Sequence, residues 1–107
     1  MRLGLNELQE TMKPWVKHNF GDRPSHQPLL GVAEEVGELC HAHLKQEQGI
    51  RVNEDQENAG RDAVGDILIY LADYCNDRKW DMEEILFLTW EHVSKRDWKA
   101  NPATGVK

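Results

Sequence analysis

The sequence has no apolar run that approaches the ~20 residues a helix needs to cross a bilayer. Its first residues, MRLGLNELQETMK, include acidic side chains and lack the apolar centre of a signal peptide. We therefore expect a cytoplasmic location and no membrane partner. Cysteine is scarce: Cys40 and Cys75 each stand within an apolar helical pattern. Cysteines in such positions are more often small buried side chains than partners in a disulfide.

The sequence also lacks an excess of positive charge, because 13 Lys and Arg residues against 19 Asp and Glu residues give a formal net charge of −6. Binding to a nucleic-acid backbone requires clustered cations that displace counterions, so a nucleic-acid polymer is not an expected partner. A small phosphorylated molecule is compatible with this charge if metal ions stand between its phosphates and the carboxylates. The charge therefore disfavours a DNA-binding module and leaves a nucleotide enzyme open.

Helical periodicity covers most of the 107 residues, and no segment has a convincing strand pattern. We predict one domain with an all-α, four-helix-bundle fold, whose helices span about residues 3–19, 29–48, 56–78 and 82–97. Gly49 is the expected C-cap of the second helix. Asp81 and Glu84 have the spacing of an N-cap and capping box for the fourth. Residues 98–107 have no periodicity and are expected to be extended or mobile.

Two of the predicted helices carry an acidic stripe beside a broad apolar side. The stripe of helix 29–48, at 100° per residue, consists of Glu34, Glu35 and Glu38. The stripe of helix 56–78 consists of Asp62, Asp66, Tyr70, Asp73 and Asp77. Like charges one turn apart destabilise a helix by about 0.2–0.5 kcal/mol per pair, which suggests a compensating cation. A solvated acidic face explains the same pattern, and the spacing alone does not decide between the two readings.

A hard divalent cation fits the chemistry of these stripes. Mg²⁺ takes one or two carboxylates and completes its coordination with water and substrate phosphates. Carboxylates from two facing helices would hold one or two such ions and leave positions open for a polyphosphate and a water. If the stripes hold a cation, we therefore expect Mg²⁺, with Mn²⁺ as a substitute.

The segments that carry the stripes, EEVGE at 34–38 and DAVGDILIYL at 62–71, resemble the signature of a known family. This family is the MazG-like all-α nucleoside triphosphate pyrophosphohydrolases, a superfamily that includes dimeric dUTPases and dCTP pyrophosphatases. Its signature has EExxE on one helix and ExxD on the next. The resemblance covers about residues 15–98. It implies a homodimer or homotetramer that cleaves (d)NTP to (d)NMP and pyrophosphate, for house-cleaning or control of the nucleotide pool.

The resemblance also assigns roles to the acidic residues. Glu35 and Glu38 match the second and third glutamates of EExxE, and Asp66 closes ExxD, so these three would bind the metal. Glu34 would lie beside the metals, either as a ligand or as the base that orients the attacking water. These assignments make the three glutamates the implied catalytic group.

The second motif departs from the family at one position. Ala63 stands three residues before Asp66, where the family has glutamate. Asp62 lies one helical turn before Asp66 and would replace the missing ligand directly or through water. The number and spacing of bound metals therefore depend on Asp62.

Tyr70 matches a tyrosine that contacts the nucleotide in some members.

The remaining substrate contacts are expected from cations and aromatic residues. Lys45, on the acidic side of its helix, is the first candidate for binding phosphate, followed by Lys95, Arg96 and Lys99. The end of the first helix is expected to cover the base, through Trp15, His18, Asn19 and Phe20. Each of these cations is equally an ordinary surface residue, and Trp15 also belongs to the apolar side of its helix.

Other motifs point to weaker alternatives. Glu38 and His41 form a single ExxH, whereas a di-iron bundle needs two such motifs and two further glutamates. His41 and His43 diverge by about 200° on a helix and cannot share a zinc ion, and His43 is expected to be buried. Trp80, Trp90 and Trp98 are expected to pack, Trp90 together with Ile85, Leu86 and Val93. The alternative function is a non-catalytic helical interaction or adaptor protein.

Overall fold

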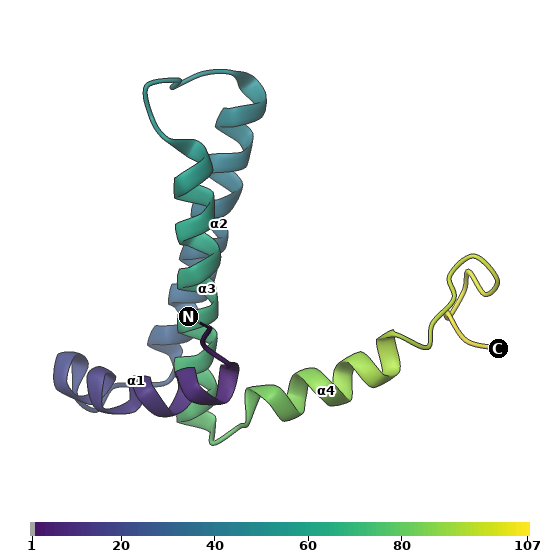
Figure 1. Ribbon diagram of the computed structural model, residues 1–107, viewed down its shortest axis with the longest axis horizontal. Helices are drawn as coiled ribbons and strands as arrows, with labels where there is room; N and C mark the ends of the chain where they lie inside the picture. Colours follow the sequence, from purple (N-terminus) through teal and green to yellow (C-terminus); the bar gives the residue numbers. More distant parts are fainter. Residues whose placement is uncertain (1) are drawn as a thin grey trace.

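The computed structural model describes residues 2–107, and this part of the chain contains four α-helices and no strand (Figure 1). The helices are α1 (Leu5–Phe20), α2 (His26–Gln48), α3 (Gln56–Arg78) and α4 (Met82–Val93). The prediction of an all-α protein is confirmed. Within the described residues, no helix has the length and apolar character needed to cross a membrane.

Helices α2 and α3 form a long antiparallel hairpin (Figure 1). Gly49 ends α2 in the left-handed conformation with φ of +66°, as its predicted role as C-cap requires. The Asp55 side chain begins α3 by accepting a hydrogen bond from the backbone N–H of Asn58. Ala42 and Ala63 are almost fully buried. These small side chains allow the two helix backbones to approach closely.

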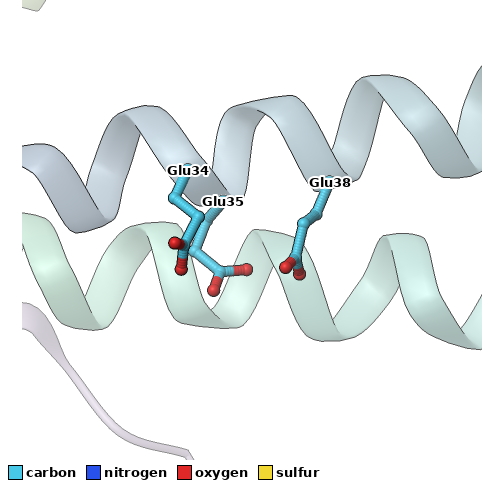
Figure 2. Close-up of side chains that lie close together, drawn as sticks. All are labelled: Glu34, Glu35 and Glu38. Carbon is cyan, nitrogen blue, oxygen red and sulfur yellow. The ribbon is translucent and has the colours of Figure 1, made fainter.

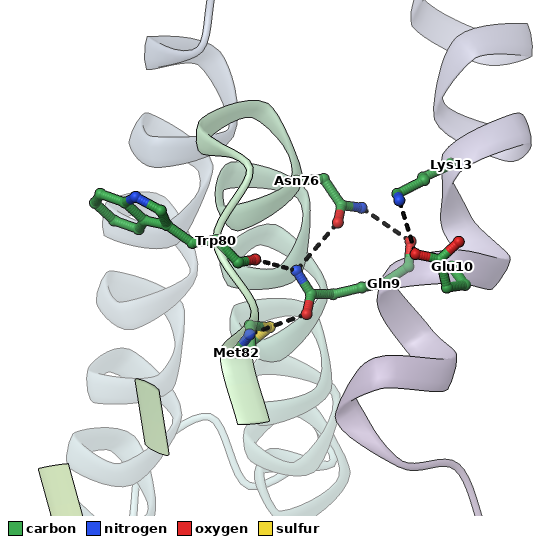
Figure 3. A network of polar contacts seen from close by, with 6 residues as sticks. All are labelled: Gln9, Glu10, Lys13, Asn76, Trp80 and Met82. Carbon is green, nitrogen blue, oxygen red and sulfur yellow. Dashed lines mark hydrogen bonds and ion pairs between the residues drawn. The ribbon is translucent and has the colours of Figure 1, made fainter. Parts of the chain in front are cut away.

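Helix α1 crosses the open end of the hairpin (Figure 1). Met12 and Val16 of α1 pack against Ala72 of α3 in a small apolar cluster. Next to this cluster, the Gln9 side chain joins α1 to the turn between α3 and α4 (Figure 3). These contacts fix where α4 begins.

Gln9 satisfies its polar atoms completely at this junction. Its Nε2 donates to Oδ1 of Asn76 at 3.1 Å and to the carbonyl oxygen of Trp80 at 2.8 Å. Its Oε1 accepts from the backbone N–H of Met82 at 3.0 Å, and Asn76 Nδ2 donates to the Gln9 carbonyl at 2.9 Å (Figure 3). The polar groups of this network are therefore hydrogen-bonded to one another, as buried polar groups in native structures usually are.

Helix α4 leads away from the other three helices (Figure 1). Asp81 is its N-cap, as predicted, because its side chain accepts from the backbone N–H of Glu84. The radius of gyration is 17.5 Å, against about 13 Å for a compact domain of this size. The predicted packing of the α4 apolar side is therefore wrong for the single chain: the exposed residues include Ile85, Leu86, Phe87, Trp90 and Val93. Trp80 and Trp98 are exposed as well.

Several boundaries differ from prediction for local reasons. Helix α2 begins at His26 rather than residue 29, because Pro28 in the first turn has no N–H that needs an intrahelical partner. Helix α4 ends at Val93, four residues early. The following segment turns back on itself: the Asp97 carboxylate accepts from the N–H groups of Lys99 and Ala100, and the Asp97 N–H donates to the Gly105 carbonyl. Residues 98–107, expected to be extended or mobile, thus form a series of turns.

Two predicted buried residues are exposed. Cys40 faces solvent, whereas Cys75 is buried as expected. His43 is also exposed, and its Nε2 lies 2.9 Å from Glu47 Oε1 on the next turn. His43 nevertheless lies beside α3, because it lines a shallow groove together with Gly60 and Val64 of that helix. The apolar side of α2 remains open to solvent, with Leu29, Val36 and Leu44 exposed.

Candidate metal centre

Three glutamates of α2 bring their carboxylates together over α3 (Figure 2). Glu34 and Glu35 are adjacent, and Glu38 follows one turn later, so the helix places all three on neighbouring positions. One carboxylate oxygen from each lies within 4.8 Å of the others. This spacing suits three carboxylates that share a divalent cation.

Glu35 is the buried member of this group. Glu35 is buried, with 8% of its surface exposed, whereas Glu34 and Glu38 face solvent. Its Oε2 is buried without a hydrogen-bond partner. Burial raises the pKa of Glu35, and the charges of Glu38, Asp66 and Glu34 raise it further. The chain therefore holds a carboxylate where ionisation is disfavoured, and among the described residues the charges that act on its pKa are all acidic.

Helix α3 contributes Asp66 and Tyr70 to the same region. The charge of Asp66 acts on Glu35 across the helix pair. Burial raises the pKa of the Tyr70 hydroxyl. The charges of Glu34, Glu35, Asp66 and Asp73 raise it further, with Asp73 contributing least. Tyr70 therefore keeps its proton and can donate a hydrogen bond to an anion at this site.

Gly31 allows Tyr70 to lie this close to α2. A Cβ atom on Gly31 would stand 2.5–2.7 Å from three atoms of the Tyr70 ring, well inside van der Waals contact. Gly31 is one turn before Glu34 and Glu35 on the same helix. The ring therefore packs directly on the α2 backbone at the edge of the glutamate group.

Asp62 does not join the three glutamates. It is exposed, and it is not among the charges that raise the pKa of Glu35. Ala63, at the position of the glutamate in the ExxD motif that the sequence resembles, is 2% exposed. Asp66 is also exposed and lies outside the group of three glutamates, but its charge acts on Glu35.

Apart from Tyr70, the residues expected to bind substrate lie elsewhere in the single chain. Lys45 is near the far end of α2, where its Nζ donates to Gln48 Oε1 at 3.2 Å. The expected base-covering residues, Trp15, His18, Asn19 and Phe20, are exposed at the end of α1. The rings of Trp15 and Phe20 contact each other edge to face at 5.8 Å between centroids.

The two cations expected from the end of α4 also lie apart from the glutamates. Lys95 Nζ is 3.8 Å from Glu91 Oε2, and the Arg96 guanidinium lies over the Trp98 ring at 5.9 Å. Both follow a helix that leads away from the hairpin (Figure 1). Within one chain, these side chains do not meet the carboxylates.

Two residues with clear structural roles were missed at the level of sequence. Gly31 could have been recognised as a glycine inside a helical pattern, which often marks a close approach of backbone to a neighbour. Arg23, in the loop before α2, forms ion pairs with Asp73 and Asp77 of α3. A single arginine in a polar loop carries no pattern that would identify its partners.

Comparison with known proteins adds no relative: no family model matches the chain, and neither the curated proteins nor the solved structures include a significant match.

Proposed function

We propose that this protein is a Mg²⁺-dependent nucleoside triphosphate pyrophosphohydrolase of the MazG-like type. The observation that carries the proposal is the glutamate group, in which a buried Glu35 oxygen without a partner stands among the carboxylates of Glu34 and Glu38. Buried polar atoms without partners are rare in native structures, and those that persist often serve binding or catalysis. The EExxE motif is thus supported by geometry as well as by order in the sequence.

The residues present fit a magnesium ion. All the candidate donors are carboxylate oxygens, the ligand type that Mg²⁺ prefers. Glu35 and Glu38 would hold the ion from α2, and Asp66 would approach it from α3. The bound ion would neutralise phosphate charge and make the α-phosphorus more electrophilic. Such an ion would also remove the repulsion that raises the pKa of Glu35.

The chain's own groups account for the remaining chemistry. Glu34 is exposed beside the group and can either complete the ligand set or accept a proton from a water that attacks the α-phosphorus. The bond between the α-phosphorus and the oxygen that bridges to the β-phosphate then breaks, which yields a nucleoside monophosphate and pyrophosphate. The Tyr70 hydroxyl, which stays protonated, is placed to donate to a phosphate oxygen or the sugar.

The exposed apolar surface supports assembly into a homodimer or homotetramer. Leu86, Phe87 and Trp90 on α4 are each more than half exposed, and α2 leaves Leu29 and Leu44 open. An apolar surface of this extent is typical of an interface between subunits. In such an assembly, a second copy could bring Lys45, Lys95, Arg96 or the aromatic end of α1 to the glutamates.

The same surface favours a second candidate function, that of a non-catalytic helical adaptor. An adaptor would use the apolar side of α4 to bind a different protein and would require no cation. It predicts no turnover and no effect of Mg²⁺. It leaves the unpartnered oxygen of Glu35 without a role, which is why we prefer the enzyme.

Release of pyrophosphate tests the proposal directly. The purified chain is incubated with a panel of canonical and modified (d)NTPs, with Mg²⁺, with Mn²⁺, or with EDTA. We expect monophosphate and pyrophosphate in equal amounts, dependent on the divalent ion. Glu38→Gln should abolish turnover while the far-UV circular dichroism spectrum stays unchanged. Absence of turnover across the panel, or full activity in Glu38→Gln, would refute the proposed site.

A further inference from the structure

Arg23 lies in the loop between α1 and α2 and reaches across to α3. Its guanidinium forms an ion pair with Asp73, and its Nη1 lies 3.3 Å from Oδ2 of Asp77. The side chains of Arg23 and Asp73 are only 10% and 11% exposed. Although burial lowers the pKa of Arg23, the hydrogen bond and charge of Asp73, followed by the charge of Asp77, raise it overall. The guanidinium thus stays charged in a largely shielded position.

This ion pair divides the acidic stripe of α3 into two parts. Asp73 and Asp77 are held by Arg23 at the open end of the hairpin. Asp66, further from that end, forms no ion pair with any of residues 2–107, and its charge acts on Glu35. Arg23 therefore compensates Asp73 and Asp77, whereas the charge of Asp66 acts on the glutamates of α2.

The contacts between α2 and α3 follow a single antiparallel register. Arg23, just before α2, meets Asp73 and Asp77. Further along α2, Gly31 meets Tyr70 and Leu39 lies against Gly60, so each later residue of α2 meets an earlier residue of α3. The loop at residues 49–55 joins the helices at one end, and Arg23 joins them at the other. A slip of α2 along α3 would have to break the Arg23 contacts.

We propose that Arg23 is a positioning residue for the candidate metal centre. By holding Asp73 and Asp77, it sets the register of α2 against α3, and with it the placement of Glu35 opposite Asp66 and of Gly31 against Tyr70. The role in metal binding rests on the proposed function, whereas the role in register is a property of the metal-free chain. The two parts can therefore be tested separately.

The register is measured in metal-free protein by NMR. The Gly31 Hα protons lie against the Tyr70 ring, so a nuclear Overhauser effect between them reports the contact directly. In Arg23→Gln we expect this effect to be lost and the ring-current shift of the Gly31 Hα protons to shrink. Arg23→Lys, which keeps the charge but not the forked geometry, should give an intermediate result.

Metal affinity is measured with Mn²⁺ alone, by calorimetry and by its electron paramagnetic resonance signal. Residues that orient metal ligands indirectly typically change affinity by 10–100-fold, and we expect a loss of about tenfold in Arg23→Gln. The matched control is Gln9→Ala, which breaks another buried polar network at the same end of the molecule. Because Gln9 joins α1 to the start of α4, its loss should lower the unfolding temperature and leave both readouts unchanged.

The outcomes separate the two parts. A folded Arg23→Gln protein with an intact Gly31–Tyr70 contact and unchanged Mn²⁺ affinity would overturn the proposal. An equal loss of the Gly31–Tyr70 contact and of Mn²⁺ affinity in Gln9→Ala would also overturn it, because Arg23 would then contribute only general stability. If wild-type protein binds no Mn²⁺, the proposed function and the metal part of this role are both refuted, and the NMR contact still decides the register. If Arg23→Gln does not fold, the Gly31–Tyr70 contact and the Mn²⁺ affinity are measured in Arg23→Lys and judged by the same criteria.

Discussion

Gln9 and Glu35 are buried to almost the same extent, at 6% and 8% exposure, yet their polar atoms have opposite surroundings. The Gln9 amide donates twice and accepts once, entirely within the chain (Figure 3). The Oε2 atom of Glu35 has no hydrogen-bond partner, and its nearest charged neighbours are also acids (Figure 2). Burial alone therefore does not reveal the role of a polar residue. The partners of each residue are more informative: those of Gln9 indicate a role in the fold, and the surroundings of Glu35 support the binding role that we propose for it.

Replacement of Glu35 should give the largest functional effect and no loss of stability. Glu35→Gln keeps the size of the side chain but removes a metal ligand worth several kcal/mol, so we expect pyrophosphate release to fall by about 1,000-fold. The unfolding temperature of the metal-free protein should be unchanged or higher, because a disfavoured charge is gone. Steady-state kinetics and calorimetry measure the two effects. A variant that is both unstable and active would reverse the roles we assign.

Gly31→Ala tests whether the close packing of Tyr70 matters to the site. The added Cβ would stand 2.5 Å from the ring, so the ring or the helix must move. Displacement of about 1 Å near reacting groups costs up to about 100-fold in rate. We expect kcat to fall by about tenfold or more in a folded protein.

Gly37→Ala is the matched control on the same helix, because nothing lies within 4 Å of its added Cβ. This change should stabilise α2 by roughly 0.5–1 kcal/mol and leave hydrolysis intact. Equal kinetics in the two variants would show that the Gly31–Tyr70 contact does not serve the site.

Gln9→Ala should show the opposite pattern from Glu35→Gln. It leaves buried groups of Asn76 and Met82 without partners, which costs about 1–3 kcal/mol. For a chain of this length, each kcal/mol corresponds to roughly 4–8 °C in unfolding temperature. Turnover at a temperature where the variant is folded should equal that of wild type. A drop in kcat without a drop in stability would contradict a structural role for Gln9.

The pH dependence of stability is a smaller effect that should also distinguish Glu35 from Gln9. The pKa of Glu35 is raised in the folded protein above its ordinary value of 4.5. Between that value and the raised pKa of folded Glu35, the unfolded chain has released its proton while the folded chain still holds it, so stability falls as the pH rises; above the folded pKa the loss is complete and constant. The metal-free wild type should therefore lose stability relative to Glu35→Gln over this window.

Gln9→Ala provides the comparison, because the difference between it and wild type should not vary with pH. Calorimetry without metal between about pH 4 and pH 8 measures both differences. A constant gap between wild type and Glu35→Gln would show that the carboxylate is not perturbed.

The sequence was sufficient for the helices and for which residues share a face, because both follow from local periodicity. Helix α3 has the predicted bounds, and Asp81 and Gly49 are the predicted caps. It was not sufficient for which face of a helix meets its neighbour. On α2, the side that carries Glu35 and Ala42 packs inward, whereas the more apolar side with Leu29 and Leu44 is exposed.

The same limit applied to the site. EExxE placed Glu34, Glu35 and Glu38 together because one helix holds all three. Asp62 was assigned by its distance of one turn from Asp66; α3 buries Ala63 and leaves both aspartates exposed, so the role of Asp62 stays a prediction. Contacts such as Arg23 with Asp73 span about fifty positions and have no local signature. Periodicity determines neighbours on one helix, and tertiary packing determines the rest.

The projection of α4 has a consequence for how the protein responds to dilution. Helix α4 leaves Leu86, Phe87 and Trp90 in water. If the proposed homo-oligomer covers them, mass action links the stability of the helix to the amount of chain present. We expect the melting temperature to rise with protein concentration. A cell that makes little of this chain would then hold a smaller folded fraction, not only fewer copies.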